Sequence, residues 1–96
     1  MQKYYSSNLL RRLRNEIPID SVITGLLKME TKNPYGILRF RCPLCFNFHT
    51  AINHETNLAR CFDCKKNFNP IDLVMTVSGQ SFIEAVEFLR DNASVG

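Results

Sequence analysis

Hydrophobic residues near the amino end of the chain recur at the spacing of two short amphipathic helices. The first helix is predicted over 6–15, with its leucines on one side and its arginines turned elsewhere. Pro18 interrupts this pattern and can open a second helix, predicted over 19–26, in which apolar residues follow the i, i+3, i+4, i+7 rule. The two stripes that we expect to be buried are Leu9, Leu10 and Leu13, and then Ile19, Val22, Ile23 and Leu26.

Short alternating segments replace the helical pattern in the middle of the chain, over about 27–68. The strands are predicted over 27–32, 37–41, 49–53 and 58–62. The first two flank the strong turn signal Asn33–Gly36, and the polar run 54–57 separates the other two. We therefore predict one antiparallel sheet of three or four strands.

Alternation in the second of these strands assigns its side chains to two faces of the sheet. Arg39 and Arg41 fall on one face. Leu38 and Phe40 fall on the other, and we expect Phe40 and Phe68 to belong to the core.

Two further helices are predicted after the strands, over 70–78 and 81–91. Asn69–Pro70 combines an N-cap residue with proline at the first helical position, and Gly79 is a stop signal. The run Ser81–Glu84 reads as a capping box for the last helix. The expected inward stripes are Ile71, Val74, Met75 and Ser78, and then Phe82, Ala85, Val86 and Leu89. The predicted fold class is α+β, a small antiparallel sheet flanked by short helices at both ends.

The length of 96 residues leaves room for a single domain, 1–96, and its hydrophobic fraction of 45% is ordinary for a globular chain. The net charge of +3 says little, but its distribution is uneven. Residues 1–66 hold eleven Lys and Arg against five Asp and Glu, whereas 67–96 hold one Arg against four acidic residues. Such a chain suits a polyanionic partner on one side, although a solvated mixture of charges would look the same.

The amino end shows no secretion signal, because 1–7 lead into an arginine-rich segment rather than an apolar run. No stretch approaches the length of a membrane span. We therefore expect a cytoplasmic protein without a membrane partner, in a compartment where thiols stay reduced.

All cysteines of the chain fall into two Cys-x-x-Cys pairs that fifteen residues separate. They are Cys42, Cys45, Cys61 and Cys64. This spacing is typical of a tetrahedral zinc site built from two knuckles, that is, a zinc ribbon. Four protein ligands leave no open position for water, so we predict one structural Zn²⁺.

Other interpretations of the cysteines fit less well. Two disulfides would suit a secreted protein, and a thioredoxin-like motif would be a single pair in a βαβ setting. Iron bound as in rubredoxin remains open, because tetrahedral sulfur holds either metal. His49 or His54 could replace a cysteine only by leaving a paired thiol idle, so we expect both at ordinary surface or sheet positions.

Basic and aromatic residues gather around the predicted ribbon, and they are candidates for contacts with a single strand, which requires charge for phosphates and rings for bases. The candidate nucleic-acid-binding residues are Arg39, Arg41, Phe46, Phe48, Arg60, Phe62, Lys65 and Lys66. The aromatic residues could equally wrap the metal and pack the core, and the basic residues could simply face solvent. A second basic patch, Arg11, Arg12 and Arg14, has the same two interpretations.

Four motifs occur in a fixed order: Cys42–Cys45, Cys61–Cys64, Asn69–Met75 and Ser81–Val86. Their combination resembles the zinc-binding domain of bacterial-type DNA primases, and the similarity extends over about 17–90. The family usually has histidine at the position of Cys45, so the resemblance implies a zinc site that is all-sulfur in this chain.

The resemblance implies a domain that precedes a catalytic domain, engages single-stranded DNA template and helps to start primer synthesis in DNA replication. The implied partners are single-stranded DNA, a catalytic primase domain and a helicase. Because the chain has no acidic cluster and no phosphate-binding loop, we identify no active site and expect the non-catalytic zinc domain of a primase. The alternative is a standalone zinc-ribbon module that docks on a replication or mobile-element partner.

Overall fold

The computed structural model describes residues 5–93 and confirms the α+β class. The predictions for 1–4 lie outside this range. The elements are α1 (Ser7–Asn15), α2 (Ile19–Ser21), η1 (Val22–Leu26), β1 (Thr31–Lys32), η2 (Pro34–Gly36), β2 (Arg39–Phe40), β3 (Thr50–Asn53), β4 (Leu58–Cys61), β5 (Lys66–Phe68), α3 (Pro70–Ser78) and α4 (Phe82–Asn92). No helix in the described part of the chain is both long and apolar enough to span a membrane.

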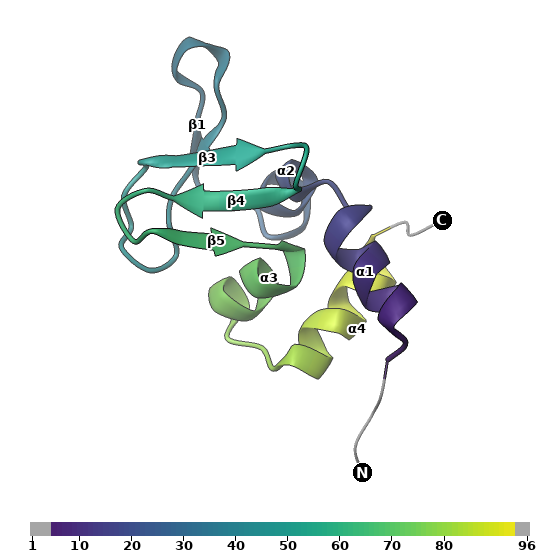
Figure 1. Cartoon of the computed structure of the whole chain (residues 1–96). Coiled ribbons are helices and arrows are strands. Elements are labelled where there is room, and N and C mark those ends of the chain that lie inside the picture. Colours follow the sequence, from purple (N-terminus) through teal and green to yellow (C-terminus); the bar gives the residue numbers. More distant parts are fainter. Residues whose placement is uncertain (1–4, 94–96) are drawn as a thin grey trace.

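The strands form two antiparallel sheets, so the prediction of one sheet was wrong. One sheet pairs β1 with β2, and the other has the order β3–β4–β5. Figure 1 shows the β1–β2 hairpin rising beyond the β3 edge of the larger sheet, with α3 below the β5 edge and α1 and α4 at one end of the sheet. β1 is shorter than the predicted strand 27–32 because Lys28 has a positive φ of 49°, which breaks the extended backbone.

Thr50 joins the two sheets through its fully buried hydroxyl group. This hydroxyl accepts a hydrogen bond from the Phe40 N–H at 2.9 Å and donates one to the Phe40 carbonyl at 2.7 Å. The Arg39 guanidinium donates to the Thr50 carbonyl at 2.6 Å. Side-chain bonds therefore replace the backbone ladder that would have made one continuous sheet.

The helix predicted over 19–26 is present, but most of it has the wider turn of a π-helix. Pro18 is its N-cap rather than its first residue, α2 has three residues, and η1 closes with an i→i+5 bond of 2.8 Å from the Leu27 N–H to the Val22 carbonyl. The Thr24 hydroxyl donates to the Asp20 carbonyl at 2.8 Å, which favours this local departure from regular α-helix.

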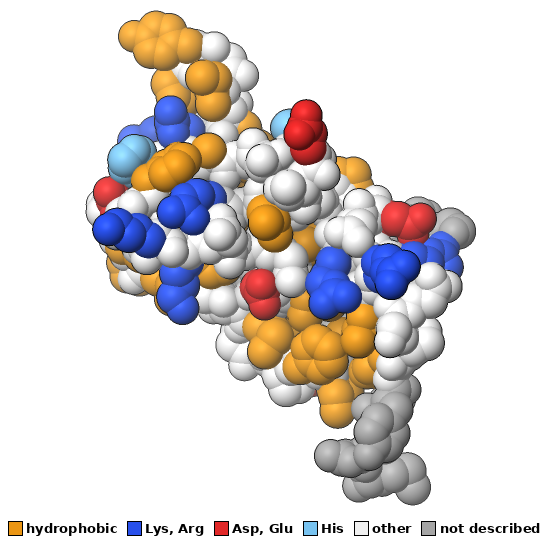
Figure 2. Space-filling model, in the orientation of Figure 1, with side chains coloured by type: hydrophobic (Ala, Val, Ile, Leu, Met, Phe, Trp, Pro, Cys, Tyr) orange, Lys and Arg blue, Asp and Glu red, His pale blue; other side chains and the backbone are white. Residues whose placement is uncertain are grey.

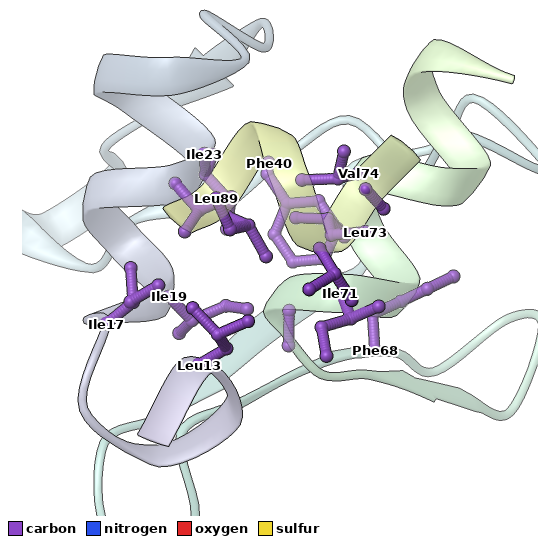
Figure 3. Packing of buried hydrophobic residues seen from close by; sticks show 14 residues of the cluster. Leu13, Ile17, Ile19, Ile23, Phe40, Phe68, Ile71, Leu73, Val74 and Leu89 are labelled. Carbon is purple, nitrogen blue, oxygen red and sulfur yellow. The ribbon is translucent and has the colours of Figure 1, made fainter. Parts of the chain in front are cut away.

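Side chains from α1, α2, η1, α3, α4 and both sheets meet in one core (Figure 3). Leu13 of α1 and Ile19 and Ile23 of the following helix are fully buried, as predicted, and so is Phe40 of β2. The core also contains Ile17, Val22, Ala59, Phe68, Ile71, Leu73, Val74, Ala85, Val86 and Leu89.

Two residues of the predicted inward stripes are exposed instead. Ser78 lies in the last turn of α3, and Leu73 is fully buried in its place. α3 contacts α1, α4 and β5, so its buried surface is wider than one helical stripe. Phe82 is 42% exposed because it starts α4 at the outer corner of the α3–α4 turn.

Local capping signals position both carboxyl-terminal helices as predicted. The Asn69 side chain accepts from the Asp72 N–H at 2.8 Å, and Gly79 ends α3 with a φ of 67°. Ser81 and Glu84 form a reciprocal capping box at the start of α4. The hydrogen bond from the Ser81 N–H to the Glu84 carboxylate lowers the pKa of this carboxyl group.

Asn57 attaches α1 and α2 to the larger sheet. Its side-chain oxygen accepts from the Ile19 N–H at 2.9 Å, and its amide donates to the carbonyls of Arg14 and Ile17 at 2.7 and 2.6 Å. The residue is 8% exposed and has a φ of 55°, a conformation that asparagine tolerates better than most residues.

We expect Asn57→Ala to lower the free energy of unfolding by at least about 2 kcal/mol, because it leaves buried backbone groups without partners and strains the left-handed backbone. Asn57→Gly should recover about 1 kcal/mol, since glycine removes only the strain. The neighbouring exposed residue provides a control, because Glu55→Ala should change stability by less than about 0.5 kcal/mol. Urea denaturation measures all three, and an unaffected Asn57→Ala would contradict this role.

Candidate metal centre

Each cysteine pair lies in a tight knuckle at the end of a strand. The first knuckle follows β2, where the Cys42 carbonyl accepts from the Phe46 N–H at 2.9 Å and the Cys42 Sγ lies 3.4 Å from the Leu44 N. The second joins β4 to β5, and there the Cys61 Sγ lies 3.4 Å from the Cys64 N. In both knuckles the residue after the second cysteine has a positive φ, which is 65° at Phe46 and 55° at Lys65. The two loops thus turn alike and direct their sulfurs toward one point.

The four sulfur atoms form a single site that can hold one zinc ion. All of them lie within 4.8 Å of one another. The Sγ atoms of Cys42 and Cys64 are 3.8 Å apart, and those of Cys45 and Cys61 are 3.6 Å apart. A tetrahedron with Zn–S bonds of about 2.3 Å has edges of about 3.8 Å, so these separations fit one shared ion.

The environment of the sulfurs is uneven. Cys42 and Cys61 are fully buried, whereas Cys45 and Cys64 are partly exposed. Hydrogen bonding with the Cys45 thiol and, next, burial raise the pKa of Cys64 to about 12 when no ion is present. A bound zinc ion needs thiolates and displaces these protons, so zinc affinity falls as the pH is lowered.

The two histidines lie outside the cysteine cluster, as predicted. His49 is exposed, and its Nδ1 lies 3.1 Å from a carboxylate oxygen of Asp63 in the second knuckle. His54 is exposed in the turn between β3 and β4. The site is therefore all-sulfur.

A cationic side chain lies over each of three exposed or half-buried aromatic rings around the metal site. The guanidinium of Arg41 lies 5.6 Å from the ring centre of Phe46, and that of Arg60 lies 5.6 Å from the ring centre of Phe62. Phe48 is paired instead with Lys32, at 4.3 Å, a residue that the sequence did not single out. The spacing of these residues along the chain gave no sign of this pairing.

The basic candidate residues differ in whether another group of the protein already binds their charge. Arg39 is half-buried and holds the Thr50 carbonyl, and Arg41 forms an ion pair of 3.1 Å with Glu30. Lys65 and Lys66 are exposed, and within 5–93 neither ammonium group has an ion-pair or hydrogen-bond partner. The second knuckle therefore presents the freer charge.

The outer face of the β3–β4–β5 sheet is open to solvent and carries part of this set. The rings of His49 and Phe62 lie 5.1 Å apart between centroids, and Arg60 lies beside Asn67, at 3.3 Å. A groove of about 410 Å³ follows this face, lined by Ala51, Ile52, Asn53, Thr56, Leu58, Arg60, Phe62 and Asn67. Figure 2 shows basic, histidine and hydrophobic side chains side by side over the knuckle end of this sheet.

Comparisons with known proteins agree with this geometry. The CHC2 zinc finger family model matches residues 5–96. A DNA primase from Streptomyces coelicolor is 27% identical over 92 residues, which are 90% of this chain. The chain spans only 14% of the length of that relative. No solved structure matches.

Removal of the metal should unfold the larger sheet. Zinc contributes an apparent stabilisation of about 10 kcal/mol in small modules, which is comparable to the whole stability of a domain of this size. Far-ultraviolet circular dichroism and amide exchange should show loss of the β3–β4–β5 sheet on chelation and its return with zinc. A chelated protein that still melts cooperatively at the same temperature would contradict a structural metal.

Exchange of Cys45 tests the ligand set. Cys45→His should keep one zinc per chain, because a partly exposed knuckle position has room for an imidazole and zinc accepts nitrogen as readily as sulfur. Cys45→Ala should lose most of its zinc affinity in a competition titration with a chromophoric chelator. Equal affinities of Cys45→Ala and the parent protein would exclude Cys45 as a ligand.

Proposed function

The chain belongs to the CHC2 zinc finger family, and from this premise we propose that it is the template-binding zinc domain of a DNA primase. In this proposal Cys42, Cys45, Cys61 and Cys64 hold one structural zinc ion. The ribbon around them engages single-stranded DNA during primer synthesis in the cytoplasm. The DNA primase relative supports this assignment, although the chain corresponds to only 14% of it.

The observation that carries the proposal is the pairing of exposed rings with cations around the metal. Phe62 is 41% exposed and Phe46 is 60% exposed, so neither ring serves mainly to fill the core. Ring faces stack on unpaired bases, and neighbouring cations attract the phosphates between them. The groove beside Arg60 and Phe62 adds the amide side chains of Asn53 and Asn67, which can form hydrogen bonds with base edges.

In this proposal the chain does not itself polymerise nucleotides. Nucleotide transfer needs carboxylates that hold divalent metal ions, and within 5–93 the only group of metal-binding side chains is the cysteine cluster. We propose that the chain acts with a catalytic primase domain, covalently linked or separate, and with a helicase. Isolated protein should then make no primers, and addition of the catalytic partner should restore them.

A second candidate function is protein docking without a major DNA contact. A groove of about 310 Å³ lies between the first knuckle and the end of α3, and its apolar lining includes Met29, Pro43 and Val77. Leu44 beside it is 45% exposed. Failure of the zinc-loaded protein to bind single-stranded DNA at any salt concentration would favour this alternative.

The stacking role of Phe62 has a matched control in the same chain. Phe62→Ala should weaken binding of a single-stranded oligonucleotide by about 1–3 kcal/mol, because one base loses its stacking partner. Phe82→Ala removes a ring that is 42% exposed at the far corner of the molecule and should leave the affinity unchanged. Fluorescence anisotropy at several salt concentrations measures both variants, after zinc content confirms that each is loaded. Equal affinities would contradict binding at this face.

A further inference from the structure

We propose that the exposed arginines of α1 form a second phosphate-binding surface, which extends the path of the single strand beyond the ribbon. This inference rests on the proposed function. The surface consists of Arg11 and Arg14, and we call it the α1 arginine surface. Its ligand is the sugar-phosphate backbone of the same single-stranded DNA that the ribbon engages.

Arg11 and Arg14 are free to take an outside partner. Both side chains are exposed, and within 5–93 neither guanidinium has a hydrogen-bond or ion-pair partner. Arg12 differs, because it forms an ion pair of 2.7 Å with Glu16. Positions three apart on a helix place their Cβ atoms about 5–6 Å apart, so two guanidinium groups can reach neighbouring phosphates.

Positive charge is crowded on α1. Three arginines occur within nine residues, and the first turn of the helix has no acidic residue. Arg14 lies in the last turn, where the helix dipole favours a cation, but Arg11 and Arg14 are three positions apart and repel each other. A polyanion would relieve this repulsion.

Much of the positive charge around the metal is offset locally, and only Lys32 and Arg39 of the neighbouring basic residues are left out of this balance. Four thiolates around one zinc ion leave two surplus negative charges, and Glu30 and Asp63 add two more. The four basic residues of the knuckles, Arg41, Arg60, Lys65 and Lys66, offset these charges. Glu16, the acidic residue at the end of α1, is paired with Arg12 rather than with Arg11 or Arg14, so the α1 arginine surface adds attraction for a polyanion to that of the ribbon.

The two surfaces share one face and are held in a fixed relation. Figure 2 shows Lys and Arg side chains gathered in two groups on the same side of the molecule, one over the knuckle end of the sheet and one over α1. Asn57 ties the end of α1 to the β3–β4 turn through its bond of 2.7 Å to the Arg14 carbonyl. A strand bound at the sheet can therefore continue over α1 without a rearrangement of the fold.

The test compares zinc-loaded parent protein with Arg11→Gln/Arg14→Gln on oligothymidylates of about 4 and about 16 nucleotides. On the longer probe, the slope of log K against log salt should fall by about 1.4, which corresponds to two phosphate contacts on a single strand. Binding of the shorter probe should stay unchanged. Lys28→Gln/Arg90→Gln removes the same charge from a loop and from an ion-paired site on α4, and it should keep the parent slope.

The outcomes separate the two proposals. A slope on the longer probe that is equal for Arg11→Gln/Arg14→Gln and the control variant would overturn the α1 arginine surface and leave the ribbon site intact. The absence of binding of either probe by the parent protein would overturn both proposals. Thermal melting checks the fold, and the double variant should melt close to the parent because both side chains are exposed.

Discussion

Convergence of four sulfur atoms on one point is the constraint on which the rest of this small structure depends. The knuckles come from different hairpins, and cross-pairs of sulfurs 3.6 and 3.8 Å apart join them. A shared zinc ion fixes the end of β2 against β4 and β5, and thereby fixes the two sheets relative to each other. The strands are two to four residues long, and so few backbone pairs would be marginal without such a closure.

Two buried polar side chains connect the strands near the metal to the rest of the fold. Thr50 links β2 to β3 by bonding both backbone groups of Phe40, and Asn57 links the β3–β4 turn to α1 and α2. Each forms hydrogen bonds with backbone groups that would otherwise be buried without partners. The free-energy cost of leaving such a group unpaired is larger than the net gain from forming one hydrogen bond. The metal closes one end of the larger sheet, and Asn57 closes the other.

Features of the chain that depend on neighbouring residues could be predicted from the sequence, and those that depend on distant residues could not. The cysteine spacing, the caps at Asn69 and Ser81 and the stop at Gly79 are local, and the structure contains all of them. The division into two sheets depends on the hydroxyl of Thr50 reaching another hairpin, which no periodicity reveals. β5 is an exception, since its pairing to β4 follows from the local turn of the second knuckle and was nevertheless not predicted.

The candidate site likewise combines features that neighbouring residues determine with features that distant residues determine. Its ligands follow from spacing, but the state of each cation depends on tertiary contacts. Arg39 and Arg41 alternate along one strand and read alike in the sequence, yet one is committed to a backbone carbonyl inside the fold and the other to Glu30. A tetrathiolate with surplus negative charge further reduces the net attraction of the knuckles for phosphate. If the chain engages a single strand as proposed, the rings near the metal would provide base stacking, and exposed charge away from the metal would add to the long-range attraction.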